Sequence, residues 1–93
     1  MKAIWNGVIL AESDDTKNIE NNEYFPPSSV NMEFFLKVET QSACPWKGLA
    51  SYYNIIVDGK INPDAAWYYA EPKKLAEPIR NYVAFWRGVK IVK

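Results

Sequence analysis

Two dipeptides constrain the fold of this chain more than any other feature of its sequence. Asn6-Gly7 separates the short apolar runs 3–5 and 8–10. Asp58-Gly59 follows residues 50–57, the strongest strand pattern in the chain, which is rich in tyrosine and β-branched residues. Asn-Gly and Asp-Gly favour the type I′ turn, because both central residues of that turn need positive φ. The sequence therefore predicts at least two tight antiparallel hairpins.

Weaker strand patterns lie on both sides of these hairpins. Residues 16–20 alternate only in part, which favours an edge strand. Beyond Asp58-Gly59, the return strand is interrupted by Pro63 and continues over residues 65–69, where Ala65, Trp67 and Tyr69 share a face. Residues 82–86 and 89–92 flank Arg87-Gly88 and predict a C-terminal hairpin, similar in sequence to the first.

Prolines and polar stretches interrupt the strands at three places. After Pro26-Pro27, Ser28 or Ser29 is expected to cap a turn of helix that ends near Phe34. Residues 73–77 lie between two prolines, so a helix there has one or two turns. Residues 39–48 mix Thr, Gln, Ser, Pro and Gly around Cys44, which predicts a structured loop of the kind that often carries function.

The length and the metal-ligating residues set how such a domain is stabilised. A chain of 93 residues holds one core, so residues 1–93 are expected to form a single domain. The chain has one cysteine, Cys44, and no histidine, which excludes an internal disulfide and a structural zinc site of about four ligands. Four Trp, six Tyr and four Phe must then supply the core. No metal and no cofactor are expected.

The charge balance argues against several classes of partner. Eleven Lys and Arg against eleven Asp and Glu give no net charge, and Lys73-Lys74 is the largest basic cluster, so nucleic-acid binding is not expected. No apolar run is long enough to cross a membrane and no signal peptide is visible, so a cytoplasmic location is expected. Four carboxylates lack the spacing expected of a general acid and base, and we expect them to lie at the solvated surface: Asp14, Asp15, Glu71 and Glu77.

Four motifs resemble those of one bacterial protein family. They are Tyr24-Phe25-Pro26-Pro27, Cys44-Pro45-Trp46-Lys47-Gly48 followed by Ala50, Tyr52 and Tyr53, Ala66-Trp67-Tyr68-Tyr69 with Pro72, and Tyr82-Val83-Ala84-Phe85-Trp86. Together they resemble the domain-of-unknown-function 427 family over residues 5–92. The resemblance implies the β-tent, or Mss4-like, fold, in which antiparallel sheets lean together. The family carries a nucleotidyltransferase-like name, but this chain has no glycine-rich phosphate loop and no carboxylate pair spaced to hold Mg²⁺.

The Cys-Pro-Trp-Lys-Gly segment holds the first candidate site residues. Cys44 has the chemistry of a nucleophile, with Lys47 three positions later to lower its pKa, yet no histidine base exists and free cysteines are often buried. Trp46 and Lys47 stand between Pro45 and Gly48, an arrangement that suits gripping an anionic or aromatic ligand. The alternative is that Trp46 fills the core while the Lys47 ammonium reaches water.

The second group of candidates consists of strand aromatics. Tyr53, Trp67 and Tyr69 would line a concave sheet face with apolar walls and hydroxyl groups, or would simply pack the core. The leading hypothesis is a non-enzymatic binding module for a small organic ligand, whose cleft joins residues 44–48 to this sheet. The alternatives are a small enzyme that uses Cys44 or Lys47 on a modest organic substrate, and a homodimeric interaction protein.

Overall fold

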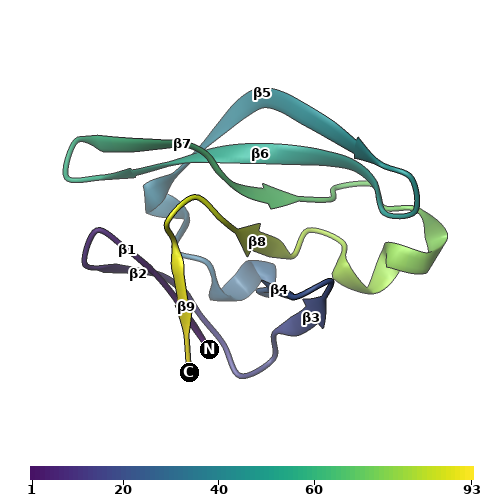
Figure 1. The fold of residues 1–93 in the computed structure, drawn as a ribbon, viewed down its shortest axis with the longest axis horizontal. Coiled ribbons are helices and arrows are strands. Elements are labelled where there is room, and N and C mark those ends of the chain that lie inside the picture. The colour runs from purple at the N-terminus through teal and green to yellow at the C-terminus, as the bar shows by residue number, and fades with distance from the viewer.

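The computed structural model describes residues 1–93 as nine strands and three short 3₁₀ helices (Figure 1). The strands are β1 (Lys2–Trp5), β2 (Val8–Glu12), β3 (Lys17–Ile19), β4 (Asn22–Tyr24), β5 (Phe35–Cys44), β6 (Gly48–Val57), β7 (Lys60–Tyr68), β8 (Val83–Phe85) and β9 (Lys90–Val92). The helices are η1 (Pro27–Ser29), η2 (Met32–Phe34) and η3 (Lys74–Ile79). The prediction of a mainly β domain with short helical turns is confirmed. No helix has the length and apolar character needed to cross a membrane.

The strands form three antiparallel sheets. The largest has the order β5-β6-β7-β8 and extends across the upper part of Figure 1. Below it lie the sheet β2-β1-β9 and the β3-β4 hairpin. Because β1 pairs with β9, with Lys2 opposite Val92, the two termini of the chain lie side by side.

Both predicted type I′ turns are present. Asn6 and Gly7 have φ of 50° and 76° and join β1 to β2. Asp58 and Gly59 have φ of 51° and 76° and join β6 to β7. Positive φ at two successive residues matches the right-handed twist of the flanking strands.

The structured loop predicted for residues 39–48 is wrong. Residues Phe35–Cys44 form the ten-residue edge strand β5, and only residues 45–47 turn back into β6. The register shifts between Lys37 and Gln41, so the mixed composition is accommodated by a bulge rather than by a loop. Backbone pairing with β6 overrides the weak local propensity of this segment.

The prediction of a C-terminal hairpin is also wrong, although the turn predicted at Arg87-Gly88 is present. Arg87 and Gly88 have φ of 53° and 85°, as a tight turn requires. However, β8 pairs with β7, while β9 crosses to pair with β1. The backbone N–H of Trp86 donates to the carbonyl of Ala65, which keeps Trp86 beside β7. A turn sequence fixes where the chain bends, but not which strand the next segment joins.

The serine cap predicted before Phe34 is wrong as well. Neither η1 nor η2 has a side-chain hydrogen bond at its N-terminus. The Ser29 hydroxyl instead donates to the carbonyl of Pro26 at 2.7 Å. Val30, with ψ of 130°, is extended and divides the expected helix into two single turns.

Alternation along β6 places a hydrophobic cluster on each side of the large sheet. The first cluster is centred on Phe25, Tyr53 and Ile55, and the second on Tyr24, Tyr69 and Ile79. Val83 and Phe85 belong to the first cluster and Ala84 to the second, so the clusters lie on opposite faces of β8.

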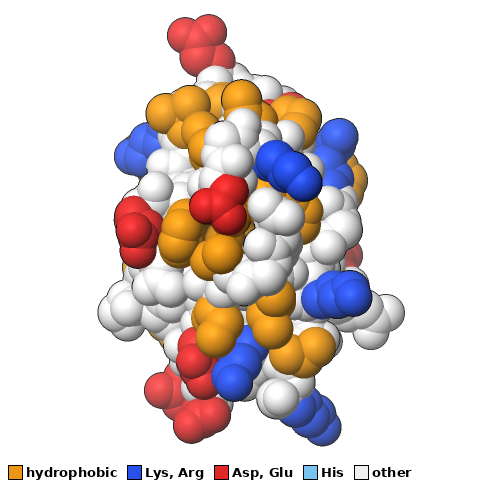
Figure 2. Space-filling model, turned by 90° about the vertical axis from the view of Figure 1, so that its left-hand side faces the viewer, with side chains coloured by type: hydrophobic (Ala, Val, Ile, Leu, Met, Phe, Trp, Pro, Cys, Tyr) orange, Lys and Arg blue, Asp and Glu red, His pale blue; other side chains and the backbone are white.

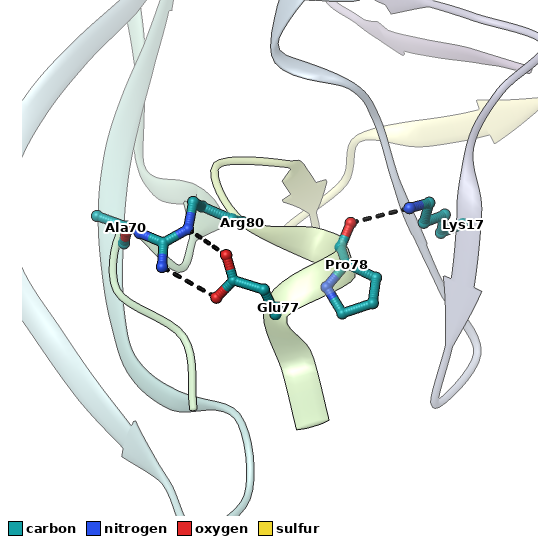
Figure 3. Close-up of polar contacts among 5 residues, drawn as sticks. All are labelled: Lys17, Ala70, Glu77, Pro78 and Arg80. Atoms are coloured by element: carbon teal, nitrogen blue, oxygen red, sulfur yellow. Dashed lines mark hydrogen bonds and ion pairs between the residues drawn. The ribbon is translucent and has the colours of Figure 1, made fainter. Parts of the chain in front are cut away.

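Helix η3 closes one side of the second cluster, where it buries Ala76 and Ile79. Figure 3 shows how it is held: the Arg80 guanidinium donates two hydrogen bonds to the Glu77 carboxylate and one, at 2.8 Å, to the carbonyl of Ala70. The Lys17 ammonium on β3 donates to the carbonyl of Pro78 at 2.9 Å. These contacts join η3 to the end of β7 and to the β3-β4 hairpin.

Figure 2 shows the end of the molecule that carries the tips of the β1-β2 and β6-β7 hairpins. Apolar side chains there are interspersed with acidic and basic ones, and neither sign forms a continuous field. The four carboxylates predicted at the surface are exposed: Asp14, Asp15, Glu71 and Glu77.

The pairing of β9 with β1 yields a first prediction. Ile91 is half-buried against the first cluster, whereas its neighbour Val92 is 40% exposed. Ile91→Ala should lower the free energy of unfolding by about 1–2 kcal/mol, and Val92→Ala should change it by less than about 0.5 kcal/mol. Urea denaturation of both variants measures this. Equal losses would show that β9 does not dock through one face.

Candidate functional site

An aromatic cleft of about 330 Å³ lies beside the second cluster. Tyr52 on β6 stands opposite Trp67 on β7, and Trp67 stands opposite Ala84 on β8, so side chains from three strands share this face. Residues from β4, from the turn between β5 and β6, and from the segment after β8 complete the wall. The lining residues are Asn22, Lys47, Tyr52, Trp67, Tyr69 and Trp86.

The aromatic walls of the cleft meet at two different angles. The rings of Trp67 and Trp86 are 5.7 Å apart with an interplanar angle of 79°, and those of Tyr52 and Trp86 are 6.4 Å apart with an interplanar angle of 39°. The Trp67 indole N–H donates to the Tyr24 hydroxyl at 3.2 Å, and that of Trp86 donates to the carbonyl of Asp64. Both indole donors are therefore used inside the protein, and the walls offer ring surfaces.

The turn between β5 and β6 brings Lys47 to this cleft. Gly48 has φ of 112°, a conformation that side chains rarely adopt, and an added Cβ would lie 3.4 Å from the backbone of Glu71 and of Lys73. The Lys73 N–H donates to the carbonyl of Lys47 at 2.9 Å. Glycine thus lets the turn pack closely against residues 71–73, which fixes the direction of the lysine.

Lys47 is buried, with 6% of its surface exposed. Its ammonium forms an ion pair with Glu20 and lies 5.3 Å from the Trp46 ring centroid and 5.7 Å from that of Tyr69. Burial alone would lower the pKa of this ammonium, but the hydrogen bond to Glu20 and the nearby tyrosines raise the pKa above its usual value. Lys47 therefore stays protonated at neutral pH. Its ammonium is buried beside Glu20, so the alternative in which it reaches water is wrong.

Glu20 occupies an uncommon backbone conformation. With Asn21 it forms the turn between β3 and β4, where the two residues have φ of 54° and 66°. Such turns favour Asn, Asp and Gly, and the left-handed region costs other residues about 1–2 kcal/mol. The Glu20 side chain remains half-exposed, and its hydrogen bond with Lys47 lowers its pKa.

The structure brings some of the predicted site residues together and separates others. Lys47, Trp67 and Tyr69 line the cleft. Cys44 packs half-buried against the second cluster, outside the lining. Trp46 is 36% exposed, so it does not fill the core.

Tyr53 lies on the opposite face of the sheet from Trp67 and Tyr69. It stacks on Tyr68, with ring centroids 4.7 Å apart, and lines a separate depression of about 400 Å³. Burial raises the pKa of Tyr53 to about 12. The prediction that Tyr53, Trp67 and Tyr69 line one cleft is therefore wrong. Tyr53 stands opposite Ala66, one position from the Tyr52–Trp67 pair, so its side chain points to the other face of the sheet.

Sequence reasoning missed Asn22, Tyr52, Trp86 and the partner Glu20. A signal existed for Tyr52, since counting back from the Asp58-Gly59 turn puts even-numbered residues of β6 on the face of Trp67. The register shift between Tyr53 and Ile55 preserves this assignment. No comparable signal exists for Asn22 or Glu20, because tertiary packing alone brings the β3-β4 hairpin to the cleft.

These features define a small antiparallel β domain with an aromatic cleft and a buried lysine at its wall. No group of three or more His, Cys, Asp or Glu side chains is placed to hold a metal ion. The chain belongs to the family described as Domain of unknown function (DUF427), whose model matches residues 1–92. Membership of this family, predicted from the four motifs, is confirmed. No curated protein matches the chain.

The burial of Lys47 gives a second prediction. Lys47→Ala removes a buried side chain and leaves Glu20 without its partner. Trp46→Ala removes a ring that is already partly exposed to solvent. Trp46→Ala should cost about 1 kcal/mol and Lys47→Ala should cost more. Thermal and urea denaturation rank the two variants. The opposite order would show that Trp46 is the structural residue of this turn.

The ion pair predicts a specific response to acid. The pKa of Glu20 is lowered in the folded protein, so its contribution to stability is present above about pH 4.5 and is lost as the pH falls through the folded-state pKa. Between about pH 6 and pH 3, the melting temperature of Glu20→Gln should fall less than that of the wild type. Equal falls in scanning calorimetry would show that the pair does not stabilise the fold.

Proposed function

We propose that this domain binds a small organic molecule with a planar ring in the aromatic cleft. The observation that carries the proposal is the arrangement of Tyr52, Trp67 and Trp86, whose rings form the walls of one concavity of about 330 Å³. Binding sites for small molecules are concave, mostly apolar and furnished with a few polar groups. Lys47 and Asn22 are the polar groups here.

The exposure of the walls supports binding over packing alone. Trp86 keeps 43% of its surface in contact with water, although its indole N–H is already bonded. A domain of this size has few apolar groups to spare, so an exposed indole beside three other rings favours a ligand contact. Tyr69 is nearly fully buried, and burial raises its pKa to about 12, so its phenol is neutral and can hydrogen-bond a ligand.

The same site offers little to a nucleophilic mechanism. A lysine nucleophile must be deprotonated, whereas the environment of Lys47 raises its pKa. Cys44 has no histidine to act as a base, since the chain contains none. Binding without chemistry is therefore the function that these side chains support best.

An NMR titration with 2-naphthamide, a neutral planar probe, tests the proposal. The four tryptophans give four indole N–H signals. Those of Trp67 and Trp86 should shift, while that of Trp5 on β1 should not, with a dissociation constant on the order of 1 mM.

Two variants provide the matched comparison. Trp86→Ala should abolish binding of the probe, and Trp46→Ala should retain it, because both indoles are exposed and only Trp86 lines the cleft. Retained binding in Trp86→Ala, or uniform shifts of all indole signals, would reject the cleft as the binding site.

A further inference from the structure

The charge arrangement at the cleft narrows the class of ligand. On the basis of the proposed binding function, we infer that the cleft takes planar aromatic carboxylates, and that the Glu20 carboxylate occupies the ligand's anion position on Lys47 until the ligand displaces it. Glu20 is thus an internal competitor at the binding site.

Lys47 is the only charged side chain that lines the cleft. A buried ammonium needs an opposite charge, and Lys47 obtains one from the half-exposed Glu20 in the turn between β3 and β4. Both wall tryptophans have used their N–H donors, so a ligand finds ring surfaces on Trp67 and Trp86 and a cation at Lys47. A flat ring that carries an anion complements both features.

The two partners of the ion pair differ in burial. The Lys47 side chain is 7% exposed and the Glu20 side chain 54% exposed. If a ligand carboxylate replaces Glu20, Lys47 keeps an anionic partner and the Glu20 carboxylate turns into water, where it is well solvated. The exchange conserves the buried charge pair and therefore avoids the cost of stranding a buried cation.

The backbone at Glu20 supports the same conclusion. Glutamate is a poor choice for a turn position with φ of 54°, which Asn or Gly would fill with less strain. Its side chain forms one ion pair, that with Lys47. A residue type that is unfavourable for its backbone conformation often has a functional role. Here the role of Glu20 is to hold its carboxylate against the Lys47 ammonium.

A second cation contacts a wall residue of the cleft. The Arg87 guanidinium carbon is 4.6 Å from the ring centroid of Trp86, and the three ion pairs of the chain do not include Arg87. Lys47 lines the cleft and Arg87 contacts one of its walls, and Glu20 is the one carboxylate paired with either cation. The local balance therefore favours an anionic ligand over a cationic one.

The experiment compares 2-naphthoate with 2-naphthamide, which share a ring and differ in charge. Wild-type protein should bind 2-naphthoate more tightly in the NMR titration. Glu20→Gln should tighten 2-naphthoate about fivefold and leave 2-naphthamide unchanged, because it removes the competing anion. Glu12→Gln is the matched control, since Glu12 forms an exposed ion pair with Lys2 on β1 and β2. It should change neither affinity.

Lys47→Met provides the complementary test. It keeps an unbranched side chain only one atom shorter and removes the charge, and it should abolish the preference for 2-naphthoate over 2-naphthamide. Glu20→Gln is an exposed substitution in a turn, so the comparison stands even where Lys47→Met does not fold.

The outcomes separate this inference from the proposed function. If both probes bind the cleft with equal affinity in wild type and in Glu20→Gln, the carboxylate preference is wrong and the aromatic binding site stands. If Glu20→Gln tightens both probes equally, Glu20 acts by blocking the cleft, and the exchange of carboxylates is wrong. If neither probe shifts Trp67 and Trp86, the proposed function fails and this inference fails with it.

Discussion

The side chains of β6 alternate between the two faces of the large sheet, and this alternation organises both hydrophobic clusters and the cleft. β6 is paired along its length with β5 on one side and β7 on the other, so its side chains can point only up or down from the sheet. Tyr53 and Ile55 consequently enter the first cluster, while Ala50 and Tyr52 belong to the second face. The cleft exists because the second face is only partly covered by η3 and the β3-β4 hairpin.

Contacts between aromatic rings stabilise this fold, as metals or disulfides do in many small domains. On the first face, Phe25 and Phe85 meet edge to face at 5.6 Å, and Phe35 meets Tyr53 in the same way at 5.4 Å. On the second face, Tyr24 meets Trp67 edge to face and accepts the hydrogen bond from its indole. Each contact adds directional preference to the area that it buries, so the rings are held in defined orientations. That order is what makes the cleft walls preorganised.

Lys47 links the stability of the domain to its proposed function. Its ammonium is desolvated, so the protein must supply an anion, and the half-exposed Glu20 does so from the turn between β3 and β4. A partner that sits in solvent can be exchanged more readily than one that is fully enclosed. The same ion pair therefore helps to fix the β3-β4 hairpin and leaves the cation available to an incoming carboxylate.

Local sequence patterns were enough to predict the two tight turns, the alternation of side chains along the strands and the family of the chain. Asn6-Gly7 and Asp58-Gly59 specified two hairpins, because positive φ is a local property, and the second turn also sets which residues of β6 and β7 share a face. Which strands and side chains pair with one another depended on tertiary packing. β9 joined β1 instead of β8, residues 39–44 became an edge strand, and Glu20 met Lys47 across 27 positions of the chain. Such contacts depend on the packing of whole sheets, which no local pattern of residues encodes.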